Sequence, residues 1–434
     1  MHRPALAASL AAAALVVAAA LLAQAGPLSP PAGPVAATPK TLTQVEPRTP
    51  ISTAPITISQ PGSYYLTRGL AVASGSAITV TAPDVTIDLN GFSLRATSTS
   101  ALRGIDATPA ATGLRVRNGA VIDFFGNGVH IEGRDAEVSD LRVTRDLAPG
   151  GFAFGIALYG PRARVTGCTV RTDTANGMNV GVYAIGEDAR VDASSAFNCT
   201  SGFSLGPNAV VTRSRAAEGG NGFFAADGAA ISDCTANRNS GMGFRIGTGS
   251  LTGCVARENE YGFTVVTAGV ITSSSARLNL VDGFRLGFNG FSNVGDVQLI
   301  DSAAYDNGRY GVHAGEGATV RGCTAALNGR AGGSTAEGGI RLAADTVADS
   351  NLAHANVGAG ISCSGNNVRI ENNTCIANTT NAVEYFSNTF LVRNASANSV
   401  TGSYIPFGVN SVVGPFNQIV GTITSNNPWT NFLY

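Results

Sequence analysis

The sequence predicts an all-β solenoid in which short parallel strands stack coil upon coil. One observation is a glycine-led motif of period about 21: glycines 181, 202, 222, 243, 262 and 283 stand 21, 20, 21, 19 and 21 residues apart. A second is a motif centred on Cys or Ser between these glycines. The third is composition, with 54 glycines in 434 residues, 13% charged and 44% hydrophobic residues. Such a chain is rich in turns yet apolar enough for a core, and its short internal period is typical of stacked repeats.

The first 55 residues differ from the repeats. Met1 to Arg3 is a short basic start, an apolar run follows, and Ala23-Gln24-Ala25 is a small-x-small site. This pattern predicts a signal peptide over residues 1–25, cleaved after Ala25, and a secreted or periplasmic protein; an uncleaved membrane anchor is the alternative. Residues 26–55 are rich in proline and predict an extended linker. No later segment is apolar enough to span a membrane, so we expect no transmembrane domain after signal removal.

Each repeat carries two apolar patterns that cannot share one strand. The first is Gly, an apolar residue (Φ), a variable residue x and usually a second Φ, as in Gly243-Phe244-Arg245-Ile246. The second is an apolar residue, a corner, then Cys or Ser and a small pair, as in Leu251-Thr252-Gly253-Cys254-Val255-Ala256. The apolar residues on either side of the corner have opposite parity, so the chain must turn there. The pattern therefore predicts three short strands per coil and three parallel sheets along the solenoid.

Two columns of small polar residues are expected at the turns. Asn follows the third strand in register at Asn239, Asn259, Asn279, Asn307, Asn328 and Asn378. Because Asn tolerates a left-handed backbone and its amide can bond its counterpart one coil above, this column predicts an internal Asn ladder. Another column alternates Cys168, Cys234, Cys254 and Cys323 with Ser194, Ser214, Ser274 and Ser302. It predicts a buried stack of small side chains, with a disulfide between the neighbouring Cys234 and Cys254 left open as the alternative.

These features resemble the right-handed parallel β-helix family, the pectin-lyase-like superfold. The resemblance implies a β-helix over residues 56–402 and a C-terminal capping segment over residues 403–434. The run Asp84-Val85-Thr86-Ile87-Asp88-Leu89-Asn90-Gly91-Phe92 is similar to the first coil of secreted bacterial members with no assigned activity. Pro428-Trp429-Thr430-Asn431-Phe432 is similar to their closing segment. Neither motif implies a reaction.

No metal or cofactor is predicted. There is no CxxC pair and no closely spaced set of Cys and His, which zinc sites need, and two Met and three His after the signal are too few for a copper-handling role. The Asn-Thr-Asp, Asp-Asp, Gly-His-Gly and Arg-Ile-Lys motifs of polygalacturonase-like hydrolases are missing, as is the Asp-Pro-His motif of alginate epimerases. The calcium-binding aspartates of pectate lyases cannot be assigned by motif either. The resemblance therefore implies the fold without these enzymes' chemistry.

The x position of Gly-Φ-x-Φ should face outward and stack from coil to coil, since both Φ residues point inward. This column brings together Arg285, His313 and Arg341 on three consecutive coils, with Arg245 two coils before Arg285. Guanidinium groups pair well with carboxylates and sulfates, so the row predicts a binding track for an acidic polysaccharide or cell-surface glycan. Tyr183 and Phe224 in the same column are candidates for stacking against sugar rings. An ordinary solvated face is the alternative interpretation.

Longer coils lie beside this row. The glycines 283, 311 and 339 are 28 residues apart, and the added residues fall in 288–296 and 329–338. Long turns on adjacent coils can wall a groove, which makes the row the preferred site.

A second part of the column predicts acid–base chemistry more weakly. Asp106 and His130 are neighbours in the column, and Glu132 lies two residues beyond His130 on the same strand. A carboxylate beside an imidazole can transfer protons, although such pairs also arise by chance on polar surfaces.

Two function classes follow. The first is a non-catalytic exported protein that binds glycans or other surfaces, or serves as a structural rod. The alternative is a polysaccharide lyase, hydrolase or epimerase with an unrecognised site on the outer face. A formal net charge of −1 argues against a nucleic-acid partner.

Overall fold

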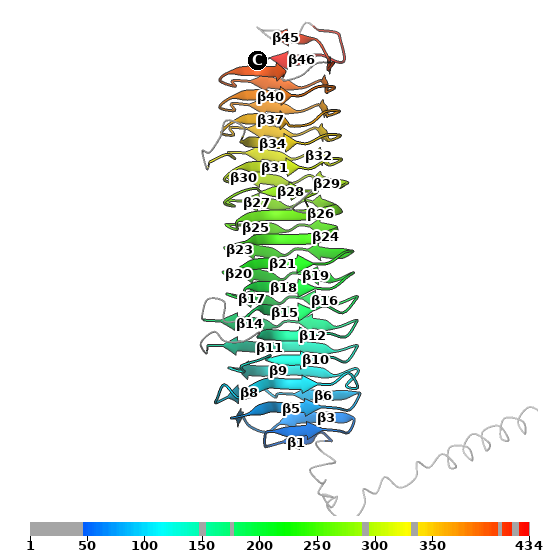
Figure 1. Cartoon of the computed structure of the whole chain (residues 1–434), viewed down its shortest axis with the longest axis vertical. Helices are drawn as coiled ribbons and strands as arrows, with labels where there is room; N and C mark the ends of the chain where they lie inside the picture. Colours follow the sequence, from blue (N-terminus) through cyan, green and yellow to red (C-terminus); the bar gives the residue numbers. More distant parts are fainter. Residues whose placement is uncertain are drawn as a thin grey trace, which may run out of the picture. The chain divides into compact units, whose positions relative to one another are not determined.

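Parallel strands stack along one axis in the computed structural model, and the unit formed by Arg48–Tyr434 is a rod (Figure 1). The structure describes residues 47–146, 153–173, 178–288, 295–330, 337–406, 410–418 and 425–433. The predicted signal peptide and most of the predicted linker lie outside these residues. No helix in the described chain is long and apolar enough to cross a membrane.

Three faces run along the rod, as predicted, and every strand pairs with its equivalent in the next coil. The first face contains β2 (Ile56–Ile58), β5 (Gly75–Val80), β8 (Ala101–Ala107), β10 (Val129–Ile131), β12 (Phe154–Leu158), β15 (Val180–Ala184), β18 (Ser201–Leu205), β21 (Asn221–Ala225), β24 (Met242–Thr252), β26 (Tyr261–Thr272), β28 (Phe284–Leu286), β31 (Tyr310–Ala314), β34 (Gly338–Leu342), β37 (Ala359–Cys363), β40 (Asn381–Tyr385) and β43 (Gly402–Pro406).

The second face begins with β1 (Thr49–Ile51), β3 (Gly62–Leu66), β6 (Val85–Asp88), β9 (Arg115–Ile122), β11 (Glu137–Arg145), β13 (Arg164–Thr166), β16 (Arg190–Asp192), β19 (Val210–Thr212) and β22 (Ala229–Ser232). It continues through the ends of β24 and β26 into β29 (Val297–Ile300), β32 (Thr319–Arg321), β35 (Val347–Asp349), β38 (Arg369–Glu371), β41 (Phe390–Val392) and β44 (Val412–Val413).

The third face contains β4 (Leu70–Val72), β7 (Ser93–Ala96), the ends of β9 and β11, β14 (Thr169–Thr172), β17 (Ser195–Phe197), β20 (Arg215–Ala217), β23 (Thr235–Asn237), β25 (Val255–Arg257), β27 (Ser275–Arg277), β30 (Ala303–Tyr305), β33 (Thr324–Ala326), β36 (Leu352–His354), β39 (Thr374–Ile376), β42 (Ala395–Ala397), β46 (Asn431–Leu433) and β45 (Phe416–Gln418).

The repeating glycine is required by close packing between coils. A Cβ atom on Gly262 would lie 2.4 Å from the carbonyl oxygen of Gly283 and 2.9 Å from the amide nitrogen of Asn279. Both distances are shorter than non-bonded atoms allow, so only glycine fits between the first face and the Asn column. This contact explains why the period is so visible in the sequence.

The Asn ladder is confirmed, and Asn356 fills the gap between Asn328 and Asn378. Each side-chain amide from Asn239 to Asn356 donates to the amide oxygen of the next Asn at 2.9–3.2 Å. One detail of the prediction is wrong: the left-handed residue is the one before each Asn, such as Glu258 at φ 56°. The Asn side chain closes the turn from the following position, where it also donates to a backbone carbonyl of the coil before.

The Cys/Ser column is also confirmed as a buried stack. All seven cysteines are free, including the neighbouring Cys234 and Cys254, and burial raises the pKa of these two thiols to about 12 and about 11. Beyond Cys323 the column continues as a second Asn ladder, which the sequence analysis missed, formed by Asn351, Asn373, Asn394 and Asn431. Asn431 carries this ladder into the segment predicted as the cap.

Aromatic rings fill the interior under the first face. Phe244, Phe263 and Phe284 stack in one buried column, which extends back through Phe223 to Phe203. Neighbouring ring centroids lie 4.6–4.9 Å apart, which is the spacing of adjacent strands.

Both ends of the rod hold more coil than the predicted boundaries of residues 56 and 402 allow. Strand β1, at Thr49–Ile51, pairs with β3, so regular structure starts inside the predicted linker. At the other end β43 pairs with β40, and β46 pairs with β42. The segment 403–434, expected to be a cap, therefore also adds strands to the faces.

Candidate functional site

The outward column of the first face lies in the predicted register. Consecutive coils pair in the order Asp106, His130, Ala157, Tyr183, Ser204, Phe224, Arg245, Thr264, Arg285, His313, Arg341 and Ser362. Full solvent exposure of this column was expected and is wrong. His130 and Thr264 are 5% and 2% exposed, and the ring of Tyr159 lies against His130.

The three arginines of the column have no carboxylate partner among the described residues. Arg245, Arg285 and Arg341 are half-buried, and none of them forms an ion pair with the described chain. The Nε atoms of Arg285 and Arg341 are buried without a hydrogen-bond partner. Among the other outward arginines, Arg238 is paired with Glu258 at 2.9 Å, whereas Arg190 forms no ion pair with the described chain. The row differs from such isolated arginines because its three unpaired guanidinium groups share one column of the first face.

Each of these arginines lies over an aromatic ring. The distances from guanidinium carbon to ring centroid are 4.7 Å for Arg245 over Phe224, 5.2 and 4.6 Å for Arg285 over Tyr261 and Phe288, and 5.4 Å for Arg341 over Tyr310. A cation over a ring face is stabilised while its hydrogen-bond donors stay free for a ligand. Arg341 also donates from Nη1 to the Tyr310 hydroxyl at 2.6 Å.

His313 belongs to a buried cluster that the sequence analysis did not find. Asp282 is fully buried and accepts two hydrogen bonds from Arg309, at 2.9 and 2.6 Å. The Nδ1 atom of His313 lies 3.4 Å from the same carboxylate. Asp282 and Arg309 lie just before the glycines of two adjacent coils, at positions outside the x column, so only the coil stacking brings them together.

The surroundings of His313 disfavour its protonated form. Burial lowers the pKa of His313 below its ordinary value, with further lowering by Arg309 and Arg341, although Asp282 opposes the shift. Burial alone would raise the pKa of Asp282, but hydrogen bonds from His313 and Arg309 outweigh it and keep the pKa below its ordinary value. The charged row is therefore made by the arginines, and His313 is an uncharged position near neutral pH. The expected groove walls at 288–296 and 329–338 lie mostly outside the described residues.

The two predicted stacking residues have other neighbours. Tyr183 stacks on Phe154 with ring centroids 4.7 Å apart and meets the edge of Tyr159 at 5.5 Å. Phe224 is 39% exposed and carries Arg245 on its ring. Tyr183 therefore belongs with the Asp106 group rather than with the arginines.

The predicted acid–base group is assembled on the same face. His130 Nδ1 lies 3.1 Å from Asp106, and His130 Nε2 lies 3.8 Å from Glu132. Arg103 donates to Asp106 at 2.7 Å. Arg103, Asp106, His130 and Tyr159 line a hollow of about 430 Å³. Burial alone would raise the pKa of Asp106, but hydrogen bonds from His130 and Arg103 lower it below its ordinary value. The charge of Asp106 is matched here by the neighbouring Arg103.

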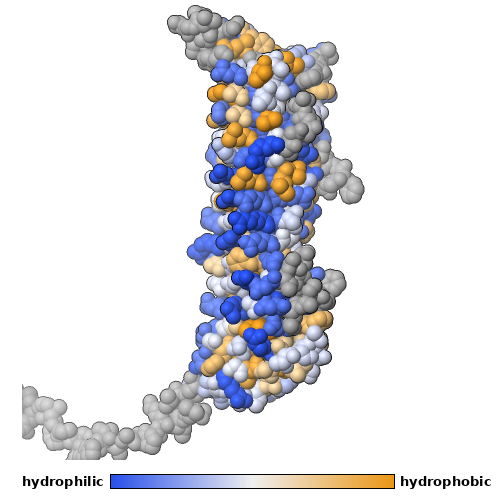
Figure 2. Space-filling view, turned by 90° about the vertical axis from the view of Figure 1, so that its left-hand side faces the viewer, coloured by the Kyte–Doolittle hydropathy of each residue, from blue (hydrophilic) through white to orange (hydrophobic). Residues whose placement is uncertain are grey.

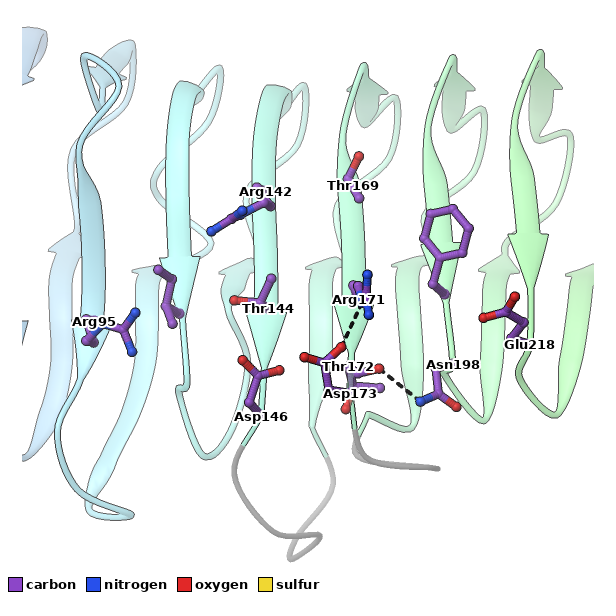
Figure 3. Close-up of a pocket in the computed structure, with 12 residues that line it drawn as sticks. Arg95, Arg142, Thr144, Asp146, Thr169, Arg171, Thr172, Asp173, Asn198 and Glu218 are labelled. Atoms are coloured by element: carbon purple, nitrogen blue, oxygen red, sulfur yellow. Dashed lines mark hydrogen bonds and ion pairs between the residues drawn. The ribbon is translucent and has the colours of Figure 1, made fainter.

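A larger hollow, about 700 Å³, lies on the third face and was not predicted (Figure 3). Asp146 and Asp173 approach each other across neighbouring coils, and burial together with the charge of Asp173 raises the pKa of Asp146. Arg171 neutralises Asp173 at 2.7 Å. The only sequence signal was the 27-residue separation of the two aspartates, close to one coil. Figure 2 shows the side that carries β14, β17 and β20 in Figure 1, with hydrophilic residues gathered at mid-height of the rod.

The family model for the right handed beta helix region matches residues 103–276 and 288–422, which is more than half of the chain. The chain belongs to the right-handed β-helix family. A search of the curated proteins finds no match.

Several solved structures are similar to this member of the family. The mannuronan C-5 epimerase AlgE4 A-module of Azotobacter vinelandii is 18% identical, covering 82% of this chain and 91% of its own, at a TM-score of 0.42. The catalytic unit of a GH87 alpha-1,3-glucanase from Streptomyces thermodiastaticus strain HF3-3 is 11% identical. The match covers 87% of this chain and 61% of the glucanase chain, at a TM-score of 0.34. The Siphovirus 9NA tailspike receptor binding domain is 9% identical. The match covers 86% of this chain and 78% of the tailspike chain, at a TM-score of 0.34. Since one fold hosts many functions, function is argued below from this chain's own side chains.

Proposed function

We propose that the protein binds an acidic glycan along the first face and that it is exported by its N-terminal signal. The observation that carries the proposal is the row of Arg245, Arg285 and Arg341, three guanidinium groups in one column that are supported by aromatic rings and lack carboxylate partners in the described chain. The carboxylates or sulfates of a glycan would supply the missing anions.

The test is titration with a polyuronate, a sulfated glycan and a neutral polysaccharide at two salt concentrations. The wild type should bind the anionic polymers, more weakly at high salt because exposed charges are screened, and leave the neutral one unbound. The triple variant R245Q/R285Q/R341Q should lose this binding. Arg190→Gln is the matched control, because Arg190 is an exposed second-face arginine that also forms no ion pair with described residues. Equal binding by wild type and triple variant would reject the proposal.

A second candidate function, uronate-modifying catalysis, is favoured by the hollow around His130. An imidazole between two carboxylates, with Arg103 and Tyr159 alongside, contains the groups for proton transfer next to a bound acid. Incubation with polyuronates, followed by measurement of unsaturated ends, reducing ends and epimerised residues, tests it. Turnover that disappears in His130→Gln would establish catalysis, and absence of all three products would leave binding as the function.

A further inference from the structure

The arginines of the row do not occupy every coil. Register pairs Arg245 with Thr264, Thr264 with Arg285, Arg285 with His313 and His313 with Arg341. Neighbouring strands are about 4.8 Å apart, so consecutive arginines stand roughly 10 Å apart along the axis. The row is periodic, with one cation every second coil.

The same support recurs at each step. Arg245 lies over a ring from the coil before, Phe224, and Arg285 and Arg341 lie over Tyr261 and Tyr310 of their preceding coils. Tyr261 and Tyr310 each directly precede a repeat glycine, so the last two arginines use equivalent positions. The module is therefore ring on one coil and guanidinium on the next, repeated along the face.

At the x positions between the arginines, the column itself offers no charge to a ligand. Thr264 is 2% exposed, and its hydroxyl has no hydrogen-bond partner in the described chain. His313 is turned toward the buried Asp282, and the charge of that carboxylate is matched by Arg309. A chain bound along this column therefore meets positive charge at intervals of two coils and uncharged x positions between them.

That interval is about the length of one disaccharide in an extended polysaccharide. We propose that the row selects a linear glycan that presents one anionic group per disaccharide toward the protein and lies along the solenoid axis, with three consecutive disaccharides matched to Arg245, Arg285 and Arg341. This inference rests on the proposed function and specifies the ligand of the same site. It makes the spacing of the charges, and not only their number, the basis of recognition.

Two single variants, each of which removes one positive charge from the row, distinguish the effect of charge spacing from the effect of total charge. In Arg245→Gln the pair Arg285 and Arg341 remains at the two-coil spacing, so a tetrasaccharide still bridges two cations. In Arg285→Gln the remaining arginines are four coils apart, and a tetrasaccharide can reach only one of them.

The experiment measures binding of di-, tetra- and hexasaccharides of alternating uronic acid and N-acetylated hexosamine. For the tetrasaccharide we expect about a tenfold loss of affinity in R285Q, because one charge-assisted contact is lost. In R245Q we expect about a twofold loss, because one of the two pairs of arginines that the tetrasaccharide can bridge remains. Wild-type affinity should rise with each disaccharide up to the hexasaccharide. R190Q is the control for general charge, and unchanged thermal unfolding is the control for the fold.

Equal losses in R245Q and R285Q would overturn the inference while leaving glycan binding intact. Failure of the wild type to bind anionic polymers of any kind, in the titration described above, would reject the proposed function and the inference together.

Discussion

Two stretches of one column on the first face handle charge in opposite ways. Around Asp106 and His130, the cation Arg103 touches the carboxylate of Asp106 at 2.7 Å, and His130 lies 3.1 Å from the same carboxylate. Farther along, Arg285 and Arg341 touch aromatic rings and no described carboxylate. The backbone is equivalent in the two places, so the difference lies in the side chains. Arg103 is already paired with a carboxylate, whereas the guanidinium groups of Arg285 and Arg341 are available to the anionic groups of a ligand.

The largest effect on the free energy of unfolding is expected from removing the carboxylate of Asp282, compared with that of Asp106. Asp282 is fully buried, and Asp282→Asn would leave Arg309 without its counter-charge, which should lower the free energy of unfolding by about 3 kcal/mol. Asp106 has a side chain 26% exposed, and Asp106→Asn should cost about 1 kcal/mol. Denaturant unfolding of the two variants measures the difference. If Asp106→Asn proved the more damaging, the assignment of the buried cluster would be wrong.

An intermediate effect concerns pH. The folded state holds the pKa of His313 below 6.5, so the unfolded chain binds more protons just below that pH. The contribution of His313 to stability is therefore complete above pH 6.5 and declines as the pH falls toward its folded pKa. Asp282 has a lowered pKa too, and its contribution declines only below pH 3.8. The stability of His313→Gln should vary less than that of the wild type between pH 6.5 and 5; identical pH profiles would contradict the assignment.

The smallest effect is expected at Thr264. Its hydroxyl is buried without a partner in the described chain, so Thr264→Val should change the free energy of unfolding by less than about 0.5 kcal/mol or raise it slightly. Phe263→Ala, one residue away in the aromatic stack, is the contrasting control and should cost about 3–5 kcal/mol. Thermal unfolding of both variants provides the measurement. Comparable losses would show that the inward and outward positions have been confused.

Most of the fold was predictable because every coil requires the same residue types at its turns and inward positions. The glycine at 262 has no alternative residue, the Asn column closes a recurring turn, and the Φ positions must point inward, so period and parity identify all three faces. The second Asn ladder was missed because its members, such as Asn351 and Asn373, replace Cys and Ser in a column recognised by those residues. The ends were misplaced because β1 and β43 carry no glycine-led motif.

The site was only partly predictable. Stacking order in the column followed from the repeat, so Arg285 and Arg341 were found, but burial of the column depends on the size of neighbouring side chains. Asp282 and Arg309 lie outside the motif positions and 27 residues apart. The glycine spacing indicates the length of this coil, but not which of the residues before each glycine come into contact. The lowered pKa of His313 follows mainly from its burial, which no sequence pattern indicates.

The most direct test removes one arginine from each stretch. We would measure the affinity of the wild type, Arg285→Gln and Arg103→Gln for the same polyuronate at low salt. Both variants lose one positive charge from the first face, but Arg103 is already paired with Asp106 at 2.7 Å. We expect at least a tenfold loss in Arg285→Gln and less than a twofold change in Arg103→Gln. Equal losses, or a larger loss in Arg103→Gln, would contradict the claim that the unpaired arginine row is the glycan-binding site.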